Sequence, residues 1–137
     1  MLPDKLCFVD IETTGTGLTH DRIIEIGMLR VESGKLVNTY KSLIDPEIRI
    51  DPFIEQMTGI QTHELESAPT LYDIKDEILE LLDGAVFVAH NVRFDYGFLR
   101  CEFKRIGTNF SSKHFCTVKL SRSLFHCDRF HMLQLYL

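Results

Sequence analysis

The feature that most limits the folds open to this chain is the run "FVDIETTG", residues 8–15, which carries two acids two positions apart. A β-strand turns successive side chains to opposite faces, so Asp10 and Glu12 share one face and the apolar residues around them share the other. Like charges buried this close together are costly unless a cation lies between them or one is neutralised. The run therefore predicts a core strand with a hard divalent ion beside it. An edge strand with one solvated face is the alternative.

Length and composition limit the class of protein. The 137 residues suit one domain, 1–137, and are too few for two. With 45% hydrophobic and 26% charged residues, the composition is that of an ordinary globular protein. We find no apolar stretch that could cross a membrane, no signal-peptide layout, and no CxxC pair among the four cysteines. These observations predict a cytoplasmic protein with reduced thiols and no membrane partner.

Charge is divided unevenly along the chain. Residues 1–83 contain 7 Lys and Arg against 17 Asp and Glu, whereas residues 84–137 contain 8 against 3. The net charge of −5 argues against a protein that coats DNA, but the basic last third could present a face to a polyanion. A solvated helix surface is the alternative. The cations are Arg93, Arg100, Lys104, Arg105, Lys113, Lys119, Arg122 and Arg129.

The first half of the chain is typical of a β-hairpin followed by a short helix. Two β-rich runs within residues 22–46 meet at a turn around Ser33 and Gly34. Together with the first strand they predict three adjacent strands. After them, Asp51 is placed to cap a short helix that begins at Pro52 and ends at Gly59.

The second half alternates helix and strand. A capping-box-like pair, Thr70 and Asp73, opens a helix that Gly84 ends. The short apolar run at 85–90 predicts a central strand covered on both faces. A helix to Gly107 and a strand near 114–118 follow, which completes a mixed α/β fold with antiparallel and parallel strands. The apolar stripes expected to face the core are Leu71, Ile74, Ile78 and Leu81 on the first helix and Tyr96, Leu99, Phe103 and Ile106 on the second.

A second group of polar residues, "HNVRFD" at 90–95, lies where the central strand gives way to a helix. Asn91 is a good N-cap, and Asp95 falls in the first turn, where the helix dipole favours a negative charge. Asp95 could instead point back over the strand end, where open α/β sheets keep their ligands. If the two strands are neighbours, it would meet Asp10 and Glu12, and Mg²⁺ or Mn²⁺ is the natural occupant of three carboxylates.

These segments resemble a known family. "DIETTG" at 10–15 is similar to the first motif, and "HNVRFD" at 90–95 to the second, of the DEDD-type (DnaQ-like) 3'-5' exonucleases, which include the proofreading epsilon subunit of DNA polymerase III. Between them, "MTGIQTHELESAPTLYDI" at 57–74 is similar to the connecting segment of that family. The resemblance runs from Lys5 to about Leu135. It implies an RNase H-like fold with a mixed sheet and flanking helices.

The resemblance also implies a function, which we state as an expectation. Asp10, Glu12 and Asp95 would be catalytic ligands of two Mg²⁺ or Mn²⁺ ions that serve phosphodiester hydrolysis at the 3' end of a DNA or RNA strand. A DNA polymerase catalytic subunit is an expected partner. The residues implied to bind or brace the terminal nucleotide are Thr13, Thr14, Gly15, His90, Asn91 and Phe94. For Phe94, packing in the core is an equally good interpretation.

The third motif of that family is missing from the expected place. In one branch it is a His, the general base, followed five positions later by an Asp, the fourth metal ligand. The only such pair is His90 with Asp95, which belongs to the second motif, and His131 has no acid at that spacing. The chain also ends on an apolar patch, Met132, Leu133, Leu135, Tyr136 and Leu137. We therefore expect a domain that is incomplete at its C-terminus, with weakened metal binding and slow turnover.

Three alternatives remain open. A non-catalytic module could use the basic last third to hold a nucleic-acid end or a polymerase. A phosphatase or a kinase-like acceptor domain is disfavoured because we find no phosphate-cradling Gly-rich loop. A zinc site is the third, although its spacings match no standard pattern. Its ligands would come from His114, Cys116, His126, Cys127 and His131.

Overall fold

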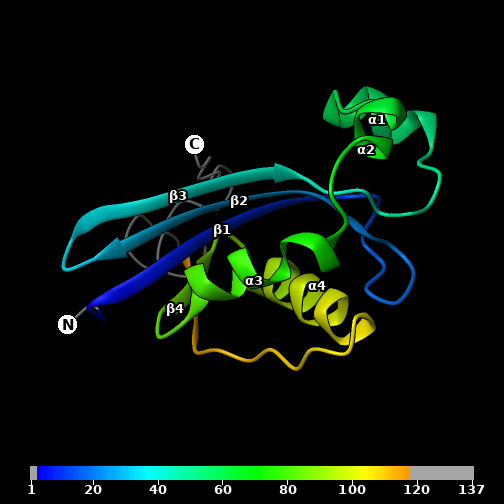
Figure 1. The fold of residues 1–137 in the computed structure, drawn as a ribbon. Coiled ribbons are helices and arrows are strands. Elements are labelled where there is room, and N and C mark those ends of the chain that lie inside the picture. The colour runs from blue at the N-terminus through cyan, green and yellow to red at the C-terminus, as the bar shows by residue number, and fades with distance from the viewer. Residues whose placement is uncertain (1–2, 118–137) are drawn as a thin grey trace, which may run out of the picture.

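The structure, a computed structural model, describes residues 3–117, which form a five-stranded mixed sheet with helices packed against one face (Figure 1). The strands are β1 (Lys5–Thr13), β2 (Ile23–Glu32), β3 (Lys35–Leu43), β4 (Val86–Ala89) and β5 (His114–Cys116). The helices are α1 (Pro52–Thr58), α2 (Thr62–Glu66), α3 (Leu71–Leu82) and α4 (Val92–Arg105). Helices α3 and α4 lie side by side against the sheet, whereas α1 and α2 lie beyond one end of it (Figure 1).

The strand order is β3-β2-β1-β4-β5. β1 pairs antiparallel with β2, and β2 with β3, whereas β4 runs parallel to both β1 and β5. The mixed sheet is therefore as predicted. The alternative of an edge strand is wrong for β1, because this strand has a neighbour on each side.

Local signals in the sequence account for several boundaries. Ser33 and Gly34 form a two-residue hairpin loop with φ of 52° and 76°, the left-handed backbone that such tight hairpins need. Asp51 accepts a hydrogen bond from the N–H of Phe53 at 2.8 Å and so caps α1. At the start of α3, the capping box of Thr70 and Asp73 is present as predicted.

The end of α3 is closed by a side chain from the sheet. Nη1 of Arg30 donates to the carbonyl oxygens of Leu81 and Asp83, each at 2.8 Å. Its Nε donates to Oε1 of Glu32 at 3.0 Å. Because the last carbonyls of a helix have no partner within it, this guanidinium satisfies them and ties β2 to α3.

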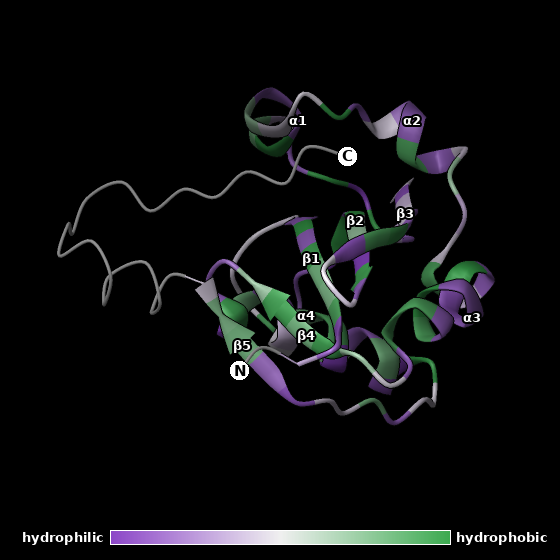
Figure 2. Cartoon of the chain, turned by 90° about the vertical axis from the view of Figure 1, so that its left-hand side faces the viewer, coloured by the Kyte–Doolittle hydropathy of each residue, from purple (hydrophilic) through white to green (hydrophobic). Residues whose placement is uncertain are grey.

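The main core lies between the sheet and the pair α3 and α4. On β1 the helix-facing residues are buried, with Cys7, Val9 and Ile11 between 0% and 7% exposed, while Asp10 and Glu12 lie on the opposite, open face. Figure 2 shows the hydrophobic side of α3 turned toward the sheet and its hydrophilic side turned outward. The predicted stripes of both helices are in this core, Tyr96 and Ile106 being partly buried at its margin.

One element was not anticipated from the sequence. Residues 51–69 contain two helices, and the second, α2, has only five residues and no side-chain N-cap. It is held instead by a small separate cluster, in which Leu65 is 2% exposed. The other buried members are Ile24, Ile50, Ile54 and Ile60. Of the helices within residues 3–117, none has both the length and the apolar character needed to cross a bilayer.

The core makes a direct prediction for stability. Ile78 of α3 is 0% exposed, so Ile78→Ala should lower the free energy of unfolding by about 2–5 kcal/mol through lost burial and a residual cavity. Urea unfolding measures this. Ile48, which is 44% exposed, provides the matched control, since Ile48→Ala should change stability by no more than about 0.5 kcal/mol. Equal losses in both variants would contradict the assignment of the core.

Candidate active site

The parallel pairing of β1 with β4 places two polar segments side by side. Phe8 lies opposite Val88, and β4 ends one residue later at Ala89. The next residues, Asp10 on β1 and His90 after β4, line one small depression together with Phe8, Val9, Val88, Ala89 and Thr117. The carboxyl ends of neighbouring parallel strands thus meet at the edge of the sheet where α/β folds commonly place ligands.

The side chain of His90 is held by Thr117, the residue that follows β5. Its Nδ1 lies 2.9 Å from Oγ1 of Thr117, a hydrogen-bond distance. The ring also lies close enough to Asp10 for its charge to lower the carboxyl pKa, although burial has the larger, opposite effect. His90 is therefore at the candidate site, as the resemblance implies.

Asp95 is the buried acid of the site. It lies in the first turn of α4 and is 5% exposed. Burial, followed by the charges of Asp10 and Glu12 and then by Cys116, raises the pKa of its carboxyl from 3.8 to about 8. The structure therefore brings Asp95 within electrostatic reach of the two acids of β1. The helix dipole would act in the opposite direction, so burial and repulsion outweigh it here.

The acids of β1 differ from expectation in their burial. Asp10 and Glu12 are exposed residues on the open face of the sheet, so the prediction that they are buried in the core is wrong. Their carboxyl groups are nevertheless partly desolvated, and this raises both pKa values. For Glu12, the charges of Asp10 and Glu25 raise the pKa further.

Glu25 is a member of this acidic group that sequence analysis missed. The register of the β1–β2 pair places Glu25 directly opposite Glu12. Like charges at opposed positions of an antiparallel pair repel each other. The adjacency of the first strand to the hairpin was predicted, but the register of β1 against β2 could not be, because the residues between these strands do not form a tight turn of known length.

Asn91 occupies the position predicted for it, with a different conformation. It is the N-cap residue of α4, but φ of 75° and ψ of 61° place it in the left-handed region, and its side chain makes no capping hydrogen bond. The predicted N-cap interaction is therefore wrong. Asn is one of the few residues that adopts this backbone readily, and the sharp change of direction brings α4 back over the end of β4.

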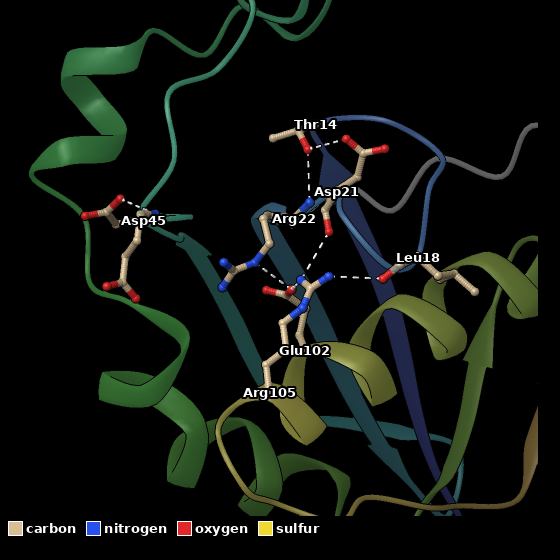
Figure 3. Close-up of polar contacts among 8 residues, drawn as sticks. Thr14, Leu18, Asp21, Arg22, Asp45, Glu102 and Arg105 are labelled. Carbon is tan, nitrogen blue, oxygen red and sulfur yellow. Dashed lines mark hydrogen bonds and ion pairs between the residues drawn. The ribbon is translucent and has the colours of Figure 1, made fainter.

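The turn after Glu12 is closed by an aspartate that sequence analysis did not single out. Oδ1 of Asp21 accepts a hydrogen bond from Oγ1 of Thr14 at 2.9 Å (Figure 3). Its Oδ2 accepts one from the N–H of Gly17 at 2.8 Å. A Cβ on Gly15 would lie 2.5 Å from Oδ2 of Asp21. Gly15 therefore leaves room for this carboxylate, whose pKa is lowered chiefly by the hydrogen bond from Gly17.

Thr13 and Phe94 also have defined surroundings. Thr13 is buried, and its Oγ1 donates to the carbonyl oxygen of Gly15 at 2.6 Å. Phe94 is partly buried against the core, with its ring 4.7 Å from that of Phe98, centroid to centroid. The core-packing interpretation of Phe94 thus has direct support, and contact with a nucleotide stays a prediction.

A second acid of α4 was also overlooked. Glu102 is 1% exposed and accepts hydrogen bonds from Nε of Arg22, at 2.8 Å, and from Nη1 of Arg105 (Figure 3). The signal was available in principle, since Glu102 falls on the apolar face of the predicted helix, seven residues after Asp95.

The side chains that could ligate a metal do not surround a common point in this structure. Within residues 3–117, no three His, Cys, Asp or Glu side chains are arranged to hold an ion as they stand. The zinc alternative includes His126, Cys127 and His131, which lie outside the described residues.

Comparison with known proteins identifies the family. The RNase T family model, described as "Exonuclease", matches residues 7–136. The chain belongs to this exonuclease family. A "3'-5' exonuclease DinG" of Staphylococcus saprophyticus is 39% identical over 132 residues, which are 94% of this chain and 15% of that protein. A "DNA polymerase III PolC-type" of Caldanaerobacter subterraneus is 38% identical over 124 residues, 90% of this chain and 9% of that protein.

Solved structures confirm the predicted RNase H-like fold. Apo Exonuclease I superposes with a TM-score of 0.78 at 19% identity, over 90% of this chain and 31% of that one. Escherichia coli Exonuclease I in complex with a 5cy-dA13 oligonucleotide gives a TM-score of 0.79 at 20% identity, over 90% and 30%. The chain thus spans less than a third of the length of these exonucleases, and 9% to 15% of the two relatives above.

The buried carboxyl predicts a pH dependence of stability. Folded Asp95 has a pKa of about 8 against an ordinary 3.8, so its contribution to stability is present at low pH and is lost as the pH rises through 8. Asp95→Asn removes this titration. In the absence of divalent ions, the native chain should lose stability relative to the variant as the pH is raised from about 5 to about 9. The loss should exceed about 1.4 kcal/mol, the free energy of one pKa unit.

Urea unfolding in EDTA across this pH range measures the difference. Asp76→Asn, an exposed position on α3, is the control and should leave the pH profile unchanged. Parallel profiles for Asp95→Asn and the native chain would show that Asp95 ionises normally.

Proposed function

We propose that this chain is a metal-dependent 3'-5' exonuclease module that hydrolyses phosphodiester bonds at the 3' end of a DNA strand, or of an RNA strand. One observation carries the proposal: at the end of the parallel strands, Asp95 of α4 is buried within electrostatic reach of Asp10 and Glu12 on β1, so that burial first, and then the charges of these two acids, raise the pKa of its carboxyl. The relative named "3'-5' exonuclease DinG" supports the direction of the reaction.

The donor set suits Mg²⁺ or Mn²⁺. All three groups are carboxylates, the ligands that hard divalent cations prefer. Without a cation, Asp95 holds a proton up to about pH 8, which relieves the repulsion from Asp10 and Glu12. To bind an ion, the three side chains have to turn toward a common point, since they do not enclose one as they stand. When bound, such ions would supply electrostatic stabilisation of the reacting phosphodiester oxygens in the proposed two-metal chemistry, and Asp10, Glu12 and Asp95 would hold them.

The neighbouring residues have roles in this proposal. His90 and the turn formed by Thr13, Thr14 and Gly15 flank the acids and would orient the terminal nucleotide. Asn91 and Phe94, at the start of α4, would border it on the other side. In this proposal none of these residues supplies the general base, a role that the resemblance gives to the third-motif His in one branch of the family.

Slow turnover is part of the proposal. After Asp95 the 137 residues contain no His with an Asp five positions later. Without a general base to take the proton of the attacking water, the rate should fall by about 10² to 10⁴-fold. We therefore propose that a polypeptide of these residues alone keeps its affinity for the substrate and cleaves it slowly.

A basic stripe on α4 supports a polyanionic substrate. Arg93, Arg100 and Lys104 are exposed and share one side of the helix at helical spacing. The two acids of α4, Asp95 and Glu102, are buried on the opposite side. From Arg93 to Lys104 the helix rises over 11 steps, about 17 Å at 1.5 Å per residue, which is long enough for several phosphates of an extended strand. Its first member, Arg93, lies in the first turn of α4, as Asp95 does, so the stripe begins at the same end of the helix as the site.

Part of the stripe borders a groove. The groove lies along α4 and the segment that follows it, and its lining includes Gly97, Arg100, Lys104 and Asn109, with Leu18 of the loop after β1. The Exonuclease I structure that holds a 5cy-dA13 oligonucleotide supports a single-stranded substrate. The PolC-type relative supports association with a DNA polymerase catalytic subunit, and such a role in replication would place the protein in the cytoplasm.

Cleavage tests the metal site. Asp10→Asn should abolish release of mononucleotides from a 3'-labelled single strand in Mn²⁺, because one carboxylate ligand is lost, while strand binding persists. Asp76→Asn is the control and should cleave like the native chain. A native chain that binds the strand but never cleaves it, at any enzyme concentration, would favour the non-catalytic binding module instead.

Salt dependence tests the basic stripe. The double variant Arg100→Gln, Lys104→Gln removes two phosphate contacts, so it should bind a single strand more weakly and lower the slope of log K against log salt by about 1.4, at about 0.7 per contact. Fluorescence anisotropy over a range of salt concentrations measures the slope. Lys35→Gln on β3 is exposed and should leave it unchanged. An unchanged slope in the double variant would mean that the stripe is only a solvated surface.

A further inference from the structure

Glu102 is a buried acid that the proposed chemistry does not use. It lies seven residues after Asp95, nearly two helical turns, so both side chains point to the same side of α4. Its carboxylate pairs with Arg22 and Arg105, whose side chains are 21% and 27% exposed. A buried carboxylate of this kind is tolerated only when it is paired, as it is here.

Arg105 joins α4 to the loop after β1 by hydrogen bonds. Its Nη1 donates to the carbonyl oxygen of Asp21 and its Nη2 to that of Leu18, each at 3.2 Å (Figure 3). A Cβ on Gly97 would lie 3.4 Å from Cδ2 of Leu18, so the loop also lies close against the middle of the helix.

The same loop holds the turn that follows Glu12. The N–H of Thr14 donates to the carbonyl oxygen of Arg22, and the N–H of Arg22 donates to Oγ1 of Thr14, both at 2.9 Å. The Asp21 carboxylate binds Thr14 and Gly17 as well. A continuous path of polar contacts therefore runs from α4 to the end of β1.

We propose that Glu102 is a positioning residue that, through Arg22 and Arg105, fixes α4 against residues 14–22 and so sets Asp95 relative to the acids of β1. The tether itself rests on the contacts above, and its effect on metal and substrate rests on the proposed function. A buried ion pair often adds little net stability compared with apolar packing. Its value here is that it specifies how two segments, each carrying part of the site, lie against each other.

Two variants break the tether at different points. Glu102→Gln keeps the shape of the side chain and removes its charge. Arg105→Gln removes the contacts to Leu18 and Asp21 but leaves the Arg22–Glu102 pair, so it decides the matter if Glu102→Gln does not fold. Glu80→Gln, an exposed position on α3, is the matched control.

Hydrogen exchange of the 137-residue chain tests the tether without activity. Amides of residues 14–22 should exchange at least tenfold faster in both variants than in the native chain and in Glu80→Gln, while those of β3 change little. Unchanged exchange in the loop would overturn the proposal. Faster exchange of loop and β3 alike would also overturn it, because it would show a general loss of stability.

Calorimetric titration with Mn²⁺ tests the positioning. Glu102→Gln should bind Mn²⁺ at least threefold more weakly than the native chain, with a matching loss in kcat and a smaller change in KM. Native affinity in a variant whose loop is loosened would overturn the positioning role. A native chain that takes up no Mn²⁺ would refute the proposed function, while the exchange data would still decide whether the tether exists.

Discussion

Repulsion among the carboxylates at the ends of β1 and β4 is the interaction that the rest of the site must accommodate. Asp95 is nearly inaccessible to water, and two further acids lie within electrostatic reach of it. In such surroundings a carboxylate keeps a proton or gains a cation. Burial above all, and then the charges of Asp10 and Glu12, raise the pKa of this carboxyl to about 8.

The fold holds these acids together with apolar packing. The parallel pairing of β1 with β4 fixes the strand ends, and α4 returns over them at Asn91 in a left-handed conformation. Below that point Phe98, Leu99 and Phe103 are 0% exposed and bind α4 to the sheet. The unfavourable free energy of repulsion within the site is therefore offset by apolar packing in a core several residues away. Strained or charged sites persist in folded proteins in this way.

Much of the fold could be predicted from local sequence signals, whereas the grouping of the acids could be predicted only by assuming which strands are neighbours. The periodicity of 71–82, its capping box and the apolar run at 85–89 depend on neighbours in sequence, so they could be predicted. The placement of Asp95 within electrostatic reach of Asp10 and Glu12 followed from one assumption, that β1 and β4 are neighbours. Features that depend on register or loop shape were missed: Glu25 lies opposite Glu12 only in the observed register, Asp21 acts only once its loop is closed, and Glu102 resembles an ordinary helix charge until two arginines surround it.

The two helices that cover the sheet have opposite electrical character. The charged residues of α3 are Asp73, Lys75, Asp76, Glu77 and Glu80, whereas all the exposed charges of α4 are cations. Because the helices lie side by side, the charge on this face is asymmetric (Figure 1). A molecule of this kind experiences a torque near a polyanion and approaches it with α4 first and α3 turned away. Such steering raises productive encounters in dilute salt and fades as ions screen the field.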